Sequence, residues 1–321
     1  MIRRWLLLAL TLIAAALTIG VSAQPPEPVP ATDLADENGQ FISVDGIELY
    51  YIEAGPTDGP AVMLLHGFGG STFTWRETVP ALAEAGYRVI AYDRPPYGLA
   101  EKSTAIAVSG QAYAEQLAAL MDALEIDSAV LVGHSAGGDV IARFAVDYPQ
   151  RVDSLVFAAG AVVAGTGDGQ SPVGGLQDFA NALDPTSPFA QQLVRSFLTE
   201  ARFIDLLSSA YHPDFEVTED IQTGYAQVLR VQGWEIGFLT LLTQGDSIAD
   251  PIDLDALAAV ETPVLLIWGQ DDAWVPVERG EALRQVFPAA DWVTLLEVGH
   301  LPMEEAPDDF NAALLDFLSN S

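Results

Sequence analysis

Apolar residues follow two alternating patterns along most of the chain. Apolar and β-type runs predict strands at 41–44, 47–52, 61–67, 88–92, 129–132, 154–158, 263–268 and 292–296. Helical spacing of apolar residues predicts helices at about 75–85, 111–124, 137–148, 277–287 and 308–318. Continuous apolar runs are typical of strands buried on both faces of a parallel sheet. The alternation therefore predicts an α/β fold with a mainly parallel sheet flanked by helices.

The alternation stops in the middle of the chain. Residues 165–246 contain helical patches at 189–210 and 233–244 but no convincing strand. An insertion there would lie over the carboxyl ends of the strands, where ligands bind in open α/β folds. We therefore expect a helical cap between two core segments, 41–164 and 247–321, with a peripheral helical decoration as the alternative. The apolar residues of the cap suggest an acyl or aryl pocket, although packing also explains them: Phe179, Phe189, Phe203, Trp234, Phe238 and Leu241.

The first residues have the organisation of a secretory signal peptide. Two arginines precede an almost wholly apolar stretch, and Val21-Ser22-Ala23 offers small residues for cleavage. We expect a signal peptide at 1–23 and an extracytoplasmic protein, secreted or periplasmic. An uncleaved anchor is the alternative, because the stretch approaches the lower limit of about 17 residues for a spanning helix. Residues 24–40, rich in proline and acid, are expected to form a flexible linker.

Charge is the most unusual feature of the composition. The 321 residues include 13 Lys and Arg against 45 Asp and Glu, a formal net charge of −32. Such a surface repels the phosphates of nucleic acids and anionic lipid head groups, so we expect no nucleic-acid partner. We interpret the charge as a solubilising surface. There is no cysteine, and the four histidines have no zinc-type spacing, so we expect no metal site.

One serine lies between two glycines, in the stretch Gly133-His-Ser135-Ala-Gly137. A predicted strand precedes it and a predicted helix follows it, which is the context of a nucleophile elbow. Glycines allow the chain to turn sharply there without Cβ clashes. Ser135 is therefore a candidate nucleophile, and simple capping of the helix is the alternative.

A glycine-rich loop, His66-Gly67-Phe68-Gly-Gly70, follows the strand predicted at 61–67. In hydrolases with such an elbow, one oxyanion donor is the N–H after the nucleophile and another comes from this loop. This predicts the main-chain N–H groups of Phe68 and Ala136 as donors. We expect His66 to brace the loop through its ring nitrogens, and a role as a base is the alternative.

Two further candidates follow the last predicted strands. Asp271 and Asp272 come directly after the strand at 263–268, and His300 comes after the last strand. A carboxylate at that edge could hold an imidazole in its productive tautomer. His134 directly precedes the serine but has no evident carboxylate to orient it. We therefore expect His134 to pack or hydrogen-bond behind the elbow.

These blocks resemble the α/β-hydrolase superfamily, and in particular its cap-bearing bacterial members with a serine triad. The similarity runs from about Phe41 to Leu318 through "HGFGGSTFTW", "LAEAGYRVIAYDRP", "LVGHSAGG", "LLIWGQDDAWVP" and "GHLPMEEAP". The resemblance implies Ser135 as the nucleophile, His300 as the base and then the acid, and Asp272 as the orienting carboxylate, with Asp271 as the fallback. No cofactor is implied.

The sequence departs from that family in two places. The loop "DRPPYGLAEKS" carries Pro96 and Ala100 where Gly and Ser are usual, which puts the entry of substrate in question. The residues after His300, Leu-Pro-Met, differ from the aromatic stretch often seen in hydrolases of ring-cleavage products. A serine at the elbow also argues against haloalkane dehalogenases and epoxide hydrolases.

The function expected from these residues is hydrolysis of a small apolar or aryl carboxylic ester through an acyl-enzyme. The same triad could perform C–C bond hydrolysis, amide hydrolysis or cofactor-free perhydrolysis, and sequence does not separate these reactions. A non-catalytic binding protein on the same scaffold is a third reading, but it would require a broken triad.

Overall fold

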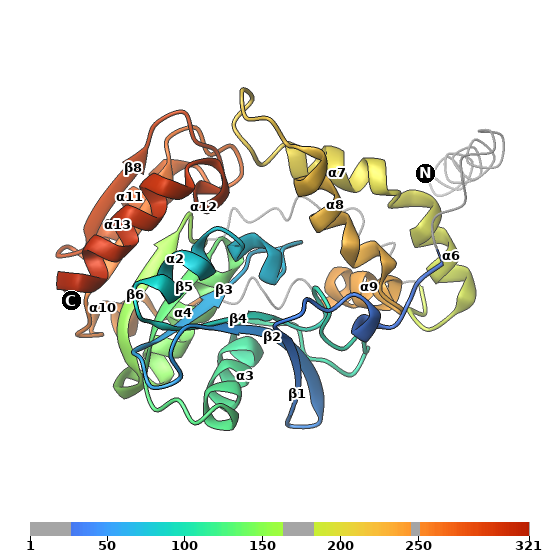
Figure 1. Ribbon diagram of the computed structural model, residues 1–321, viewed down its shortest axis with the longest axis horizontal. Helices are drawn as coiled ribbons and strands as arrows, with labels where there is room; N and C mark the ends of the chain where they lie inside the picture. Colours follow the sequence, from blue (N-terminus) through green and yellow to red (C-terminus); the bar gives the residue numbers. More distant parts are fainter. Residues whose placement is uncertain (1–26, 163–182, 245–250, 321) are drawn as a thin grey trace, which may run out of the picture.

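The computed structural model describes residues 27–162, 183–244 and 251–320. The core within these residues is one sheet of eight strands in the order β1-β2-β4-β3-β5-β6-β7-β8 (Figure 1). The strands are β1 (Gly39–Val44), β2 (Ile47–Ala54), β3 (Ala61–Leu65), β4 (Arg88–Asp93), β5 (Ala129–His134), β6 (Val152–Ala158), β7 (Val264–Gly269) and β8 (Asp291–Leu295). β2 runs antiparallel to β1 and β4, and the other pairs are parallel. The predicted α/β class is therefore confirmed.

Helices cover both faces of the sheet. The helices of the two core segments are α2 (Thr78–Glu84), α3 (Gly110–Ala123), α4 (Ala136–Asp147), α10 (Leu254–Ala258), α11 (Val277–Val286), α12 (Pro302–Glu305) and α13 (Pro307–Asn320). Side chains of α3, α4, α10 and α11 share one apolar cluster. Those of α2 and α13 share the cluster on the other face. The central strands β3 to β7 are thus buried on both sides along almost all of their length, which explains their continuous apolar runs.

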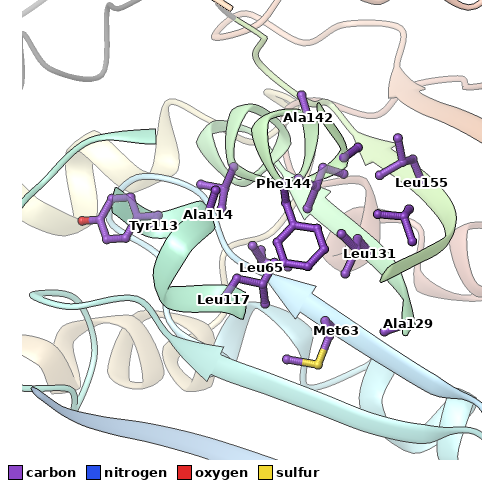
Figure 2. Close-up of a cluster of buried hydrophobic side chains, with 14 of the residues drawn as sticks. Met63, Leu65, Tyr113, Ala114, Leu117, Ala129, Leu131, Ala142, Phe144 and Leu155 are labelled. Carbon is purple, nitrogen blue, oxygen red and sulfur yellow. The ribbon is translucent and has the colours of Figure 1, made fainter. Parts of the chain in front are cut away.

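Strand β3 shows how one short run serves both clusters. All five of its residues are buried. Met63 and Leu65 belong to the cluster with α3 and α4, where Figure 2 shows them beside Leu117 and Phe144. Val62 and Leu64, which alternate with them, belong to the other cluster. The two-residue period of a strand divides the run between the two layers.

The parallel register brings several loops to one edge of the sheet. Leu65 at the end of β3 is paired with Gly133 near the end of β5, and Gly269 of β7 is paired with Leu295 of β8. The loops that follow β3, β5, β7 and β8 therefore leave the sheet on the same side. This is the edge at which ligands bind in open α/β folds.

A helical insertion separates β6 from β7. Its helices are α6 (Pro188–Phe197), α7 (Glu200–Ser208), α8 (Glu219–Ala226) and α9 (Trp234–Gln244). They gather on the side of the molecule away from α13 (Figure 1). Both expected limits of the cap, 165 and 246, lie outside the described residues. Helix α8 was not predicted, because it is only two turns long and buries few apolar side chains, among them Ile221 and Tyr225.

The segment before β1 differs from the flexible linker expected at 24–40. Val29 forms a parallel bridge with Val231, and Gln227 donates from Nε2 to the carbonyl of Leu34 at 2.8 Å. The hydroxyl of Tyr50, on β2, accepts from the Asp36 N–H at 3.0 Å. Apolar residues among the prolines and acids explain this packing, since Leu34 joins a cluster with Tyr50 and Val231.

The expected signal peptide at 1–23 lies outside the described residues. Among the residues that the structure does describe, no helix has the length and apolar character needed to cross a membrane.

Candidate active site

Ser135 lies in the turn between β5 and α4. Its backbone has φ 50° and ψ −122°, and φ values in this range are rare for residues with a Cβ. Both flanking glycines are needed for the turn. A Cβ on Gly133 would lie 2.5 Å from the carbonyl oxygen of Gly137, and one on Gly137 would overlap the carbonyl of Leu65. The Ser135 side chain makes no capping hydrogen bond to α4, so capping does not account for the serine.

His300 and Asp272 form a buried pair. The Nδ1–H of His300 donates to Oδ2 of Asp272 at 2.8 Å, and both side chains are almost completely buried. Oδ1 of the same carboxylate accepts from the main-chain N–H groups of Trp274 and Val275, each at 2.8 Å. With the proton on Nδ1, the Nε2 atom of His300 is left as an acceptor. This is the tautomer that a general base needs.

Asp271 points elsewhere. Its Oδ2 lies 3.8 Å from Nε2 of His212, and its side chain is 46% exposed. Of the two adjacent carboxylates, the structure therefore places Asp272 against His300. The fallback carboxylate, Asp271, lies at a more exposed position beside the cap.

His134 contacts the main chain of His300. Its Nε2–H donates to the His300 carbonyl oxygen at 2.8 Å, and the two rings are 4.8 Å apart between centroids. Burial lowers the pKa of His134 well below its usual value, and the neighbouring His300 lowers it further. His134 is therefore a neutral donor that fixes the loop of His300.

A carboxylate also holds that loop. Glu305 accepts from the N–H groups of Gly299 at 2.9 Å and Leu301 at 3.0 Å, on either side of His300. It accepts as well from the N–H of His212, in the inserted helical segment, at 2.8 Å. The histidine loop is thus fixed by its neighbours on the core and on the insertion.

The glycine-rich loop closely approaches the serine. A Cβ on Gly67 would lie 2.8 Å from the Cβ of Ser135. The Nδ1–H of His66 donates to the Gly67 carbonyl at 2.7 Å, and its Nε2 accepts from the N–H of Arg94 at 3.0 Å. Both ring nitrogens are therefore engaged in holding the loop. Burial and then the charge of Arg94 lower the pKa of His66 well below its usual value.

The two candidate oxyanion donors belong to the two segments that meet at the serine. Phe68 belongs to the glycine-rich loop, and Ala136 is the first residue of α4. The N–H groups in the first turn of a helix have no partner within that helix. The positive end of the helix dipole favours negative charge there. An oxyanion near Ser135 would therefore meet a favourable field.

An apolar pocket of about 40 Å³ lies between this loop, α7 and His300. Its walls are Gly67, Phe68, Gly69, Gly70, Thr74, His134, Phe203, Leu206, Leu207, Ala210, Tyr225, Trp274, His300 and Leu301. Of the six cap residues proposed for a pocket, Phe203 lines it. Trp234 and Phe238 pack within the cap instead, Phe189 is 68% exposed, and Leu241 joins the core. Phe179 lies outside the described residues.

Sequence reasoning missed several walls of this pocket. Leu206 and Leu207 follow Phe203 at the helical spacing of three and four, which is a visible signal of one helix face. Trp274 lies two residues after Asp272, so its proximity could have been inferred. Tyr225 gave no local signal, because α8 was not recognised.

A buried carboxylate joins the inserted segment to the core behind the pocket. Glu304 accepts from Arg76 at 2.9 Å and from the hydroxyl of Tyr211 at 2.6 Å. Its other oxygen accepts from the hydroxyl of Tyr225, which in turn contacts Thr74 Oγ1 at 3.1 Å. Burial raises the pKa of Glu304, and Arg76 opposes this shift. We call this group the Glu304 latch.

The unusual loop around Pro96 packs against both the site and the insertion. Tyr97 lies edge-on to His66, with ring centroids 5.2 Å apart. Lys102, the only lysine of the chain, donates from Nζ to the Tyr97 carbonyl at 3.1 Å. A Cβ on Gly237 of α9 would lie 3.0 Å from the carbonyl of Pro96. This loop therefore contacts His66 of the glycine-rich loop and packs closely against α9.

Within the described residues, no group of three or more histidine or acidic side chains could hold a metal ion.

Comparison with known proteins gives the same fold. A sequence model described as "alpha/beta hydrolase fold" matches residues 60–307. A 2-hydroxy-6-oxononadienedioate/2-hydroxy-6-oxononatrienedioate hydrolase of Burkholderia vietnamiensis is 32% identical over 282 residues, covering 85% of this chain and 92% of that one. An uncharacterized hydrolase of Bacillus subtilis, YugF, is 26% identical, covering 86% of this chain and 96% of that one.

Solved structures agree in fold at lower identity. A meta-cleavage product hydrolase from Pseudomonas fluorescens superposes with a TM-score of 0.73 at 24% identity, covering 88% of this chain and 97% of that one. A thermophilic esterase from Thermogutta terrifontis gives 0.70 at 23% identity, covering 88% and 98%. From the matched family model and these relatives, the chain belongs to the α/β-hydrolase family and is a hydrolase.

Proposed function

We propose that the protein is a serine hydrolase of short, neutral carboxylic esters. The observation that carries the proposal is the arrangement at one sheet edge of Ser135 in its strained turn and the buried pair of His300 and Asp272. A serine needs a base within reach, and the base needs a third group to orient it. The carboxylate of Asp272 meets the second requirement.

The proposed reaction has two halves. Ser135 attacks the ester carbonyl while His300 takes its proton, and the N–H groups of Phe68 and Ala136 stabilise the oxyanion. His300 then protonates the leaving alkoxide, so that an acyl-enzyme and a free alcohol result. Water attacks the acyl-enzyme with His300 as base, and the carboxylic acid leaves as Ser135 recovers its proton.

The charge of the pocket favours a neutral substrate. None of the described residues that line the pocket is a lysine or arginine. The sequence of 163–182 and 245–250 contains neither residue type either. A buried carboxylate without a cationic partner is costly, and the net charge of −32 repels anions at long range. An ester whose acyl group carries no further carboxylate fits this environment.

C–C bond hydrolysis is the second candidate. It is supported by the relatives named as hydrolases of 2-hydroxy-6-oxo-dienedioates, one of them 32% identical over most of both chains. Those compounds carry carboxylates, and the lack of a cation in the described pocket argues against them here.

A matched pair of substrates tests the proposal. The p-nitrophenyl ester of butyric acid and the p-nitrophenyl monoester of succinic acid differ only at the end of the acyl chain. The butyrate ends in a methyl group and the succinate ends in a carboxylate. We expect kcat/KM to be about a hundredfold higher for the butyrate, since the carboxylate would be buried unpaired. Fluorophosphonate labelling, mapped by mass spectrometry, should fall on Ser135.

A 2-hydroxy-6-oxo-dienoate forms the third arm of that experiment. Turnover of the dienoate with a higher kcat/KM than the butyrate ester would favour C–C hydrolysis instead. Absence of labelling on folded protein would contradict a serine nucleophile and favour a binding protein.

The two neighbouring carboxylates provide a matched comparison. Asp272→Asn should lower kcat by about ten-thousand-fold, because the N–H groups of Trp274 and Val275 would hold the amide oxygen, and the amide NH2 would then face Nδ1 of His300 and favour the wrong tautomer. Asp271→Asn, at the half-exposed neighbour, should change kcat by less than about threefold. Steady-state kinetics on the butyrate ester measure both. A larger loss for Asp271→Asn would reverse the assignment.

We also propose that the protein works outside the cytoplasm. The support is the basic and then apolar sequence at 1–23, with small residues at its end. N-terminal sequencing of the protein secreted by its own host tests this, and a mature chain beginning near Gln24 is expected. Retention of Met1 on membrane-bound protein would indicate an anchor instead.

A further inference from the structure

Two cavities at the site are both lined by α7 and by the loop after β7. The smaller one, of about 40 Å³, is the apolar pocket at His300. The larger one, of about 670 Å³, lies over the loop after β7 and reaches Asp272 from the other side. Residues that are adjacent in sequence line different cavities. On α7, Leu207 lines the small pocket and Ser208 lines the large cavity. In the loop after β7, Trp274 lines the small pocket and Ala273 lines the large cavity.

A side-chain hydrogen bond joins a wall of the smaller pocket to a wall of the larger cavity. The indole Nε1–H of Trp274 donates to Oγ of Ser209 at 3.2 Å. We call this contact the seam. Water can compete for it, because the bond is exposed and Trp274 is 37% exposed. The contact of Trp274 with Asp272 is made by its main-chain N–H, so the indole can move without disturbing that carboxylate.

The chemistry decides which part of an ester lies at the seam. His300 must protonate the leaving alkoxide, so the alcohol part of the substrate lies on the His300 side of the reacting carbonyl. The indole of Trp274 packs against His300, with ring centroids 5.5 Å apart. An alcohol part on the His300 side of the carbonyl would therefore lie near Trp274.

We propose that Trp274 determines leaving-group specificity and that the 670 Å³ cavity is the subsite for large, hydroxylated alcohols. With the seam closed, a small or aryl alcohol rests against the indole. With the seam open, a larger alcohol extends into the cavity, where Ser208 and Gln270 offer hydrogen bonds. Asp271 and Glu278 also line the cavity and disfavour an anionic alcohol. This inference rests on the proposed ester hydrolysis.

The test holds the acyl group constant and varies the alcohol. Phenyl butyrate and the 6-O-butyryl ester of glucose share their acid, but the sugar is larger and carries several hydroxyls, and the measured quantity is the ratio of their kcat/KM values. Trp274→Ala should shift this ratio toward the glucose ester by about tenfold or more. Ser209→Ala and Trp274→Phe remove the seam but keep a ring, so each should shift the ratio in the same direction by a smaller factor. If Trp274→Ala does not fold, these two variants test the inference in its place.

Two controls make the outcome specific. Phe189→Ala removes an exposed aromatic ring on α6 outside both cavities and should leave the ratio unchanged. A series of p-nitrophenyl esters from acetate to octanoate measures acyl preference separately. A change in acyl preference for Trp274→Ala with an unchanged alcohol ratio would overturn the inference, because Trp274 would then be an acyl wall.

Failure of the proposed function has a different signature. In that case the wild-type protein would hydrolyse neither butyrate ester, and fluorophosphonate would not label Ser135. Labelling of Ser135 together with an alcohol ratio that none of the three seam variants shifts would contradict the inference alone.

Discussion

Replacement of Ser135 by alanine is expected to lower kcat for the butyrate ester by about a million-fold, which is the scale measured when a triad serine is removed. The hydroxyl is the atom that forms the acyl-enzyme, and no other described serine lies in the turn between β5 and α4. The backbone should be unaffected, since alanine has the same Cβ and the turn depends on Gly133 and Gly137. Fluorophosphonate labelling should disappear together with activity.

A buried serine away from the site provides the control for that variant. Ser154 on β6 is almost completely buried, and Ser154→Ala should retain kcat within about threefold. Circular dichroism and thermal unfolding of both variants show whether the fold is intact. Substantial hydrolysis by a folded Ser135→Ala protein would contradict the nucleophile assignment.

His300→Ala is expected to cause a loss of similar size, about a million-fold in kcat, because the serine would lose the group that takes its proton. His134→Ala should cost far less, on the order of tenfold. His134 supports the reaction through its N–H to the His300 carbonyl, at 2.8 Å, and through contact of the two rings. Losing it would loosen the loop but leave the imidazole of His300 paired with Asp272.

The two histidine variants form a matched comparison, since each removes one buried imidazole at the same edge of the sheet. Kinetics on the butyrate ester, with unfolding curves for both proteins, separate loss of chemistry from loss of folding. Equal losses of kcat in two folded variants would show that His134 takes part in proton transfer.

Most elements of the core could be predicted because they have a local signal, whereas the short helices α10 and α12 were not predicted. Buried parallel strands give continuous apolar runs, and the sharp turn at Ser135 requires glycines at fixed positions on either side. The order of strands then follows from the family pattern. His300 and Asp272 are far apart in the chain, but each follows a recognisable strand.

The walls of the pocket could not be predicted in the same way. They depend on how the inserted helices lie on the core, and Tyr225 meets Glu304 across 79 positions of sequence. Aromatic residues alone did not identify the walls, because Trp234 and Phe238 pack inside the insertion. The segment before β1 misled for a related reason. Its composition is typical of a linker, but Leu34 packs against a cluster formed by the remote residues Tyr50, Leu99 and Val231.

The Glu304 latch limits how far the inserted helices can be treated as an exchangeable module. Its carboxylate is supplied by the core, and two of its hydrogen bonds come from tyrosines of the insertion. A chimaera that received its cap helices from another hydrolase would bury Glu304 with Arg76 but without those hydroxyls, and unsatisfied buried carboxylates are costly. Cap grafting in this protein should therefore transfer Tyr211 and Tyr225 with the helices, or replace Glu304 and Arg76 together.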